Sequence, residues 1–209
     1  MENGRDWSEE VKFRVFVSGE TEEFGIPKLL DRLFSIHGFH ERHIHIVRKQ
    51  SSGKKHLLSG ISTFVRHSFA DRHLSCVISL EDSDNEDIVE LKKKYKEKVN
   101  EEHKNKYRPK FAKNEIETWL LADAKALEEY GLSEVEEIEN PEIDIKIKSS
   151  QQIDQLFKKN QKKYKKTIDG PALLATLNIP IVYKKCPSFK NFIDNIFEVL
   201  NEPNPYLNL

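Results

Sequence analysis

The sequence predicts an α/β fold, with a mostly parallel sheet flanked by helices and a helical extension at the C-terminus. Short runs of strand-favouring residues alternate with longer segments of helical periodicity. Such alternation is typical of parallel strands joined by crossover helices. Beyond Gly131 only helical patterns recur. We therefore expect an α/β domain over residues 1–130 and a helical extension packed on it over residues 131–209.

The first strand and helix are the clearest elements. Apolar and basic residues alternate over residues 11–17, which is a strand pattern, and SGETEE follows at once. Apolar residues then recur at helical spacing from Glu22 to Ile36, and Pro27 is tolerated because it falls in an early turn. Gly38 supplies a stop signal, so we expect the helix to end near His37.

The same alternation continues along the chain. A second strand is expected at residues 43–47, an amphipathic helix at residues 57–69 and a buried strand at residues 74–80. The highly charged residues 88–106 are expected to form one helix. Residues 107–111 follow as a short edge strand, because Pro109 cannot donate to a sheet ladder.

The remaining segments are predicted to be helical. Residues 114–131 form a strongly helical pattern, in which Asp123 can cap a restarted helix. An acidic, proline-containing connection follows, and further helices are expected at residues 150–160, 171–178 and 187–200.

The amino-acid composition limits the classes of partner and of protein to which the chain can belong. The chain has 209 residues, enough to bury a core, and its 34 Lys and Arg against 35 Asp and Glu favour no class of partner. The charges are uneven, because residues 128–144 hold eight acids and no Lys or Arg, whereas residues 158–166 hold six lysines and no acid. Only two cysteines occur, which argues against a disulfide framework. The N-terminus MENGRDWSEE has no apolar leader, so we expect a cytoplasmic protein without a membrane partner.

Acids follow two of the predicted strands. Asp82 and Asp84 come after the strand at residues 74–80, and their spacing lets both carboxylates point to one side, as a shared hard cation requires. Glu20 and Glu22 follow the first strand, next to a helix start. Ligand sites of parallel sheets lie beyond the carboxyl ends of the strands, so the two groups together predict a site for Mg²⁺ or Mn²⁺. The alternative is that residues 82–85 form a turn that caps the next helix.

These motifs resemble the Toprim fold of topoisomerases, primases and OLD-type nucleases. The nuclease motif runs Val-Glu-Gly-x-Thr-Glu, and a later strand ends in Asp-x-Asp. The matching residues here are Val17, Gly19, Thr21, Glu22, Asp82 and Asp84. Ser18 stands where the family has its leading catalytic glutamate, which leaves open whether Glu20 takes over that role.

Most of the chain also resembles an uncharacterised Toprim-related family that is found in bacterial defence or mobile loci, often beside an ATPase. The similar segments are residues 108–123, 169–177 and 186–189. The resemblance implies a Toprim-like (Rossmann-like) domain, a metal-dependent nuclease activity and an ATPase partner in phage defence. The chain contains no G-x-x-x-x-G-K-[ST] loop, so any ATP turnover is expected in that partner.

Two further groups are candidates for the site. Glu115 and Glu117 lie two apart in a predicted helix and point to different faces, so only one is expected to face the acids, and Glu117 is nearer the apolar stripe. Tyr164 lies within a lysine cluster that is expected to contact nucleic-acid phosphates, unless it is simply a solvated helix face. The cluster consists of Lys158, Lys159, Lys162, Lys163, Lys165 and Lys166.

The sequence therefore predicts a Mg²⁺- or Mn²⁺-dependent phosphodiester hydrolase that acts on DNA or RNA. Asp82, Asp84, Glu22 and Glu117 are the expected metal ligands, and Glu20 or Glu22 is the expected general base. One alternative is a Toprim-like module that has lost catalysis and docks on an ATPase as a binding or sensor subunit. Another is a phosphohydrolase of small molecules or nucleotides.

Overall fold

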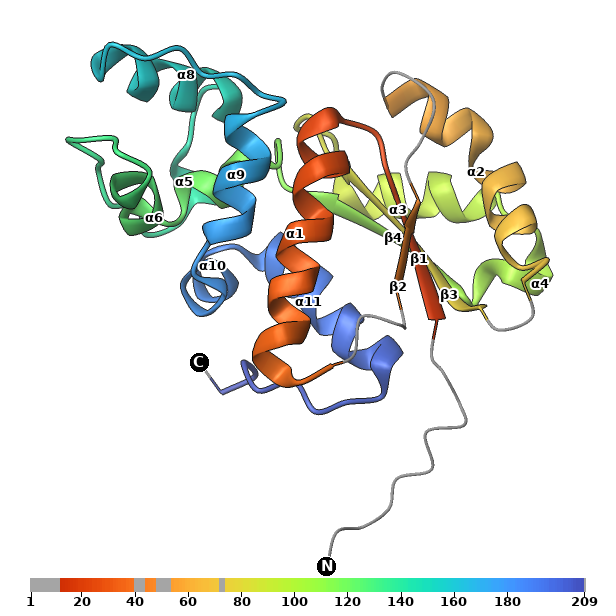
Figure 1. Cartoon of the computed structure of the whole chain (residues 1–209). Helices are drawn as coiled ribbons and strands as arrows, with labels where there is room; N and C mark the ends of the chain where they lie inside the picture. Colours follow the sequence, from red (N-terminus) through yellow and green to blue (C-terminus); the bar gives the residue numbers. More distant parts are fainter. Residues whose placement is uncertain (1–11, 40–43, 48–53, 72–73, 209) are drawn as a thin grey trace, which may run out of the picture.

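The computed structural model describes residues 12–39, 44–47, 54–71 and 74–208. Its sheet has the strand order β2-β1-β3-β4, and each neighbouring pair is parallel (Figure 1). The strands are β1 (Lys12–Val17), β2 (Ile44–Val47), β3 (Leu74–Asp82) and β4 (Tyr107–Ala112). The predicted α/β class and the C-terminal helical region are confirmed.

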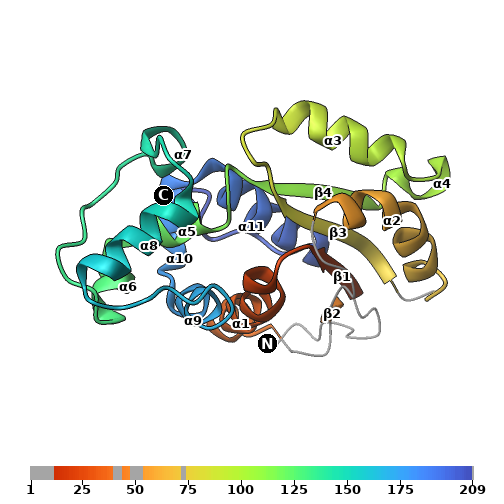
Figure 2. The same cartoon turned by 90° about the horizontal axis from the view of Figure 1, so that it is seen from above.

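Helices cover both faces of the sheet. The helices of the first part of the chain are α1 (Glu20–His37), α2 (Lys54–Ser68), α3 (Ile88–Glu97) and α4 (Glu101–Lys104). Those that follow are α5 (Glu117–Leu121), α6 (Ala124–Glu129), α7 (Pro141–Asp144), α8 (Ser149–Lys159), α9 (Asp169–Thr176), α10 (Ile179–Lys185) and α11 (Pro187–Leu200). Figure 2 shows α2 and α3 on one face of the sheet and α1 on the other, with α5 to α10 gathered at one end.

Strand alternation divides the core into two clusters. Side chains at every second position of β1 and β3, such as Val15 and Ile78, pack against α1 and α11. The intervening positions, such as Val77, pack against α2 and α3 in a smaller cluster with Tyr95 and Phe111. Asp82 continues the alternation of Ile78, so its side chain is directed to the α1 face of the sheet.

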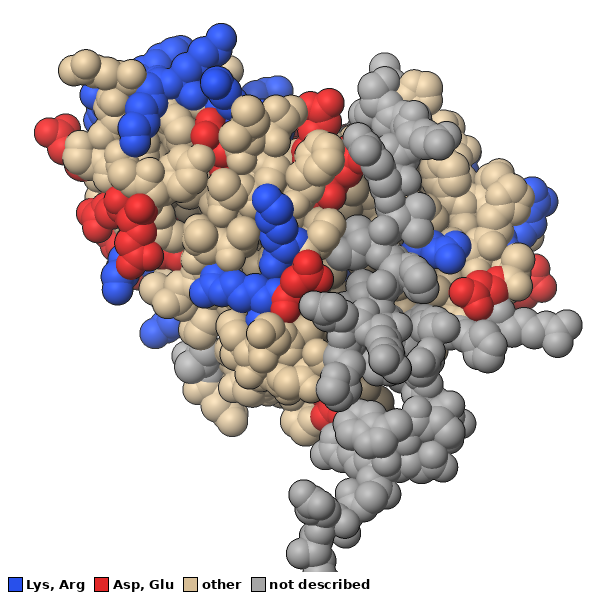
Figure 3. Space-filling view, viewed as in Figure 1, with Lys and Arg blue, Asp and Glu red and all other residues tan. Residues whose placement is uncertain are grey.

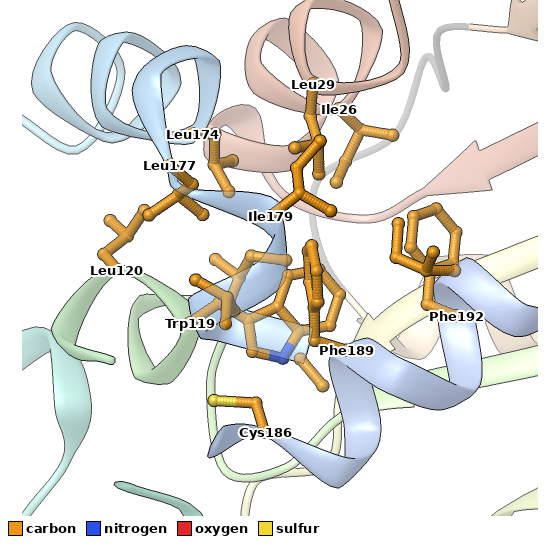
Figure 4. Packing of buried hydrophobic residues seen from close by; sticks show 14 of the residues in the cluster. Ile26, Leu29, Trp119, Leu120, Leu174, Leu177, Ile179, Cys186, Phe189 and Phe192 are labelled. Carbon is orange, nitrogen blue, oxygen red and sulfur yellow. The ribbon is translucent and has the colours of Figure 1, made fainter. Parts of the chain in front are cut away.

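Trp119 joins the helical extension to the sheet domain (Figure 4). It is fully buried, and its ring centroid lies 5.0 Å from that of Phe189 and 5.9 Å from that of Phe192, both on α11. Its indole N–H donates to the Ser188 hydroxyl at 2.8 Å. Buried residues of α1, α5, α9 and α11 therefore belong to one continuous core.

Several predicted element ends are confirmed. Gly38 ends α1 in the left-handed conformation, with φ at 69°. Asp123 caps α6 by accepting from the Ala126 N–H, and Pro109 lies in β4 at the edge of the sheet. The single helix expected at residues 88–106 is wrong, because the chain breaks after Glu97 and resumes as the short α4.

Residues 1–11, for which no apolar leader was expected, lie outside the described residues. The start of the strand expected from His43 also lies outside them. In the ranges that the structure describes, every helix is too short or too polar to cross a bilayer.

Candidate metal centre

The carboxyl ends of β1 and β3 bring two acidic segments together. The strands are neighbours in the sheet, and Val17 pairs with Leu80. The first turn of α1 and the last residue of β3, Asp82, therefore lie at the same edge of the sheet. This is the edge at which parallel sheets place their ligand sites.

Glu22 is buried in the first turn of α1, with only 2% of its surface exposed. Its carboxylate lies against the backbone of Gly19, where an added Cβ would be 2.3 Å from Glu22 Oε2. Burial raises the pKa of Glu22 to about 7, and the nearby Glu117 carboxylate contributes in the same direction. Its own backbone N–H and the Lys166 ammonium act in the opposite direction.

Asp82 is fixed by a hydrogen bond from the start of α5. Its Oδ1 accepts from the Ile116 backbone N–H at 2.7 Å. The residue is partly exposed, but burial of the carboxyl group raises its pKa well above the usual range, and the Glu22 and Glu117 carboxylates raise it further. Glu81, one position earlier, points to the opposite face of the sheet, where it accepts from the Tyr95 hydroxyl at 2.7 Å.

Glu115 and Glu117 have different environments. The carboxylate of Glu115 accepts from the backbone N–H and the hydroxyl of Ser150, at 2.8 and 3.0 Å, in the first turn of α8. Glu117 is fully buried, and its charge raises the pKa values of Glu22 and Asp82. The Glu115 charge also raises the pKa of Glu22, but less than Glu117 does, and of the two only Glu117 is among the main charges that act on Asp82. Glu117 is thus the glutamate that adds a carboxylate to the cluster of Glu22 and Asp82, which we call the acid site.

Lys166 supplies a cation to the acid site from the segment between α8 and α9. Its ammonium lies 3.1 Å from Glu117 Oε1. Burial opposes its charge, but the carboxylates of Glu117 and Asp82 raise the pKa of Lys166 overall. The Tyr164 hydroxyl donates to the same Glu117 oxygen at 3.3 Å, and the Thr21 hydroxyl donates to the Lys166 carbonyl at 3.1 Å.

Two of the predicted site residues lie apart from this cluster. Asp84 is exposed and has φ at 50°, in the left-handed region that Asp tolerates. Glu20 is exposed at the first position of α1. Neither carboxylate is among the charges that chiefly perturb Glu22 or Asp82. The alternative interpretation of residues 82–85 is correct for the turn, in which the Glu86 N–H donates to the Ser83 carbonyl at 2.9 Å. It is wrong for the cap, since Asp87 caps α3 through the N–H groups of its first turn.

The lysine cluster is divided among several roles. Lys158 pairs with Asp154 on α8 at 2.6 Å, and Lys162 donates to the Gly131 carbonyl at 2.7 Å. Lys162, Lys163 and Lys165 line an open hollow together with Tyr130 and Asp169. Figure 3 shows Lys and Arg side chains gathered over this end of the molecule.

The acid site has oxygen donors suited to a hard cation. Oε2 of Glu22 and Oε2 of Glu117 are buried and accept no hydrogen bond from the part of the chain that the structure describes. Carboxylate oxygens are the ligands that Mg²⁺ and Mn²⁺ prefer. As the side chains stand, the described residues contain no group of three or more His, Cys, Asp or Glu placed to hold a metal ion. Binding of an ion therefore requires rotation of the glutamate side chains.

Most of the chain matches the model of a known protein family. Residues 17–196 match the model of a domain of unknown function, DUF4276. The chain belongs to this family. No curated protein and no solved structure matches the chain. The part that matches the DUF4276 model includes Glu22, Asp82, Glu117 and Lys166, so the whole acid site lies within the family domain.

Sequence reasoning missed the position of Lys166. It stands among six lysines, and nothing in their spacing distinguishes the one that pairs with a buried carboxylate. In the sequence, Thr21 is recognised only as part of the Toprim-like motif. In the structure, its hydroxyl donates to the Lys166 carbonyl and so holds the segment that carries Lys166. The one signal in the sequence is that Tyr164 and Lys166 lie shortly before the helix that begins at Asp169. Only the structure shows that this helix, α9, packs on α1 and so brings Lys166 to the acid site.

Proposed function

We propose that this protein is a divalent-metal-dependent phosphodiester hydrolase that acts on nucleic acid, with Mg²⁺ or Mn²⁺ as cofactor. The observation that carries the proposal is the acid site itself. It joins three carboxylates from separate elements at the carboxyl edge of a parallel sheet, and two of their buried oxygens lack a hydrogen-bond donor among the described residues. Buried charged groups normally have partners, so unpaired carboxylate oxygens indicate a ligand.

Each residue has a role in this proposal. Glu22, Asp82 and Glu117 would hold the ion, which when bound supplies positive charge to the phosphate and an activated water. Asp82 is oriented by the Ile116 N–H, and Glu117 by Tyr164 and Lys166. The Lys166 side chain is 44% exposed, so a phosphodiester would approach the acid site from the side of this lysine.

The lysine-lined hollow, which is linked to the acid site through the Lys165–Lys166 segment, supports a polyanionic substrate. Lys163 and Lys165 line it, and Lys166, the next residue, reaches the acid site. Phosphates that flank the scissile phosphate would contact these ammonium groups. The nucleic acid would then release its condensed counterions, so the binding affinity would depend on salt concentration. This arrangement favours a nucleic-acid strand over a small phosphate ester.

Cleavage assays test the proposal. Purified protein would be incubated with plasmid, single-stranded DNA and RNA, with Mg²⁺, Mn²⁺ or EDTA. We expect metal-dependent cleavage that falls at least about 100-fold in Asp82→Asn, because oriented carboxylates position the ion that stabilises charge in the transition state. Glu90→Gln, which alters an exposed acid in the first turn of α3, serves as the matched control. Cleavage that survives in Asp82→Asn at the wild-type rate would sink the proposal.

A second candidate function is a binding or sensor module without catalysis. The observation that favours it is Ser18, which stands at the end of β1 where the Toprim nuclease motif has a glutamate. Glu20, two positions later, is exposed. An ATPase partner and a role in phage defence rest on the family resemblance. The module is favoured if the protein binds Mn²⁺ and associates with a neighbouring ATPase but cleaves none of the substrates.

A further inference from the structure

Lys166 already occupies part of the acid site as a cation. Its ammonium lies 3.1 Å from Glu117 Oε1, and the Glu117 side chain is completely buried whereas 44% of the Lys166 side chain is exposed. A buried carboxylate is stable only when it is paired or protonated. Lys166 thus stabilises the charge that a metal ligand requires.

One ammonium does not satisfy the whole site. Oε2 of Glu117 and Oε2 of Glu22 remain buried without a hydrogen-bond donor from the described residues. Asp82 also interacts with Lys166 through its charge, although its own hydrogen bond comes from the Ile116 N–H. When ionised, the carboxylates of Glu22, Asp82 and Glu117 carry three negative charges, and the Lys166 ammonium neutralises only one of them.

The ammonium of Lys166 is free to leave while its backbone stays in place. The Thr21 hydroxyl holds the Lys166 carbonyl at 3.1 Å, and Asp169 accepts from the Lys165 N–H at 2.5 Å. Gly170 fits closely against Thr21 and Tyr164, since an added Cβ would lie 2.7 Å from Thr21 Cγ2. The four-carbon stem of lysine has several rotatable bonds, and its exposed part borders solvent. Exchange of cations therefore needs a side-chain rotation and no movement of α9.

We propose that Lys166 is an internal counter-cation of the acid site and that a divalent ion binds by displacing it from Glu117. The inference rests on the proposed metal centre. It also accounts for the Glu117 carboxylate, which pairs with an ammonium while the described acids form no group of three in ligand geometry. Lys166 then lowers the affinity for metal, because the ion must replace its ammonium beside Glu117.

Calorimetric titration with Mn²⁺ tests the competition. Wild type, Lys166→Met and Lys93→Met would be compared at pH 8 in EDTA-treated protein. We expect Lys166→Met to bind Mn²⁺ about tenfold more tightly than wild type, since the ion no longer has to break a half-exposed ion pair or repel a nearby ammonium. Lys93→Met removes an exposed lysine from α3, on the other face of the sheet, and is expected to bind like wild type.

Amine labelling of wild-type protein gives an independent readout that requires no variant to fold. An acetylating reagent would be applied with and without Mn²⁺, and each lysine would be quantified by mass spectrometry. Displacement from Glu117 frees the ammonium and lowers its pKa, so labelling of Lys166 should rise severalfold with Mn²⁺. Lys162, which donates to the Gly131 carbonyl, should label equally in both states.

The outcomes separate this inference from the proposed function. Equal or weaker Mn²⁺ binding by a folded Lys166→Met variant, or unchanged Lys166 labelling, overturns the displacement while leaving a metal-dependent hydrolase possible. Absence of Mn²⁺ binding in all three proteins overturns the metal centre and the inference together. Tighter Mn²⁺ binding by Lys166→Met, together with absence of nucleic-acid cleavage by the wild-type protein, supports the displacement and contradicts the proposed hydrolase.

Discussion

Gly19→Ala is expected to damage the metal centre without removing a ligand. An added Cβ would lie 2.3 Å from Oε2 of Glu22 and 2.9 Å from its Cδ and Oε1. The backbone of Gly19 has φ at −109° and ψ at 163°, which alanine adopts readily, so the conflict falls on the Glu22 carboxylate. To reach ordinary van der Waals contact the carboxylate must move by about 1 Å.

The new Cβ also restricts the rotation by which the Glu22 carboxylate would reach an ion, so the change is large for a ligand and small for the fold. Metal–ligand distances tolerate about 0.2 Å, and a misplacement of about 1 Å in a catalytic group can cost about 100-fold in rate. We therefore expect Mn²⁺ affinity to fall about 10- to 100-fold, with a comparable loss of cleavage. Stability should change by less than about 1 kcal/mol, because alanine restricts the unfolded chain while being a slightly poorer N-cap than glycine.

Calorimetric titration with Mn²⁺ and urea unfolding measure the two effects separately. Gly60→Ala on α2 is the matched control, because its new Cβ would meet the end of the Phe64 ring at 2.6 Å, on the other face of the sheet. Gly60→Ala should bind Mn²⁺ like wild type. If Gly19→Ala folds and also binds Mn²⁺ with wild-type affinity, the Glu22 carboxylate is not a ligand, and the reasoning from the acid site is refuted.

Two further predictions concern stability. The pKa of Glu22 is raised from 4.5 to about 7, chiefly by burial, so the folded protein binds an extra proton between these values. In EDTA, the free energy of unfolding of wild type should fall relative to Glu22→Gln as the pH rises through 7, by up to about 3 kcal/mol, and parallel urea-unfolding profiles would contradict this. Phe192→Ala removes a ring that stacks on Trp119 and should cost about 3–5 kcal/mol. Because the core is continuous from α1 to α11, near-UV and far-UV circular dichroism should still report a single transition, whereas two transitions would indicate that residues 131–209 unfold separately.

Local signals account for the elements that were predicted well. The alternation in β1 and the helical spacing in α1 depend on neighbours in the chain, and so do the left-handed end at Gly38 and the cap at Asp123. The break after Glu97 was missed because residues 98–100 have no glycine or proline and resemble the charged helix on either side.

The candidate site was predicted only in part, because its members come from four separate segments. The motif places Glu22 after β1 and Asp82 at the end of β3, and the parallel pairing of these strands brings them to one edge of the sheet. The same reasoning assigned Asp84 to the metal, whereas the backbone turns to a positive φ there and leaves its carboxylate exposed. A spacing of two residues places side chains on one side only while the strand continues, and β3 ends at Asp82.

The sequence by itself determined the α/β class, the order of most elements and the acids at the ends of two strands, since these depend on local periodicity and on the parallel sheet that it implies. Only the tertiary structure decided which carboxylates are buried together and which cation lies among them. Glu117 and Lys166 meet because α9 packs on α1 and the Thr21 hydroxyl holds the preceding segment. Burial and charge pairing between distant segments are properties of the folded chain, so no local pattern distinguishes Lys166 from its neighbours.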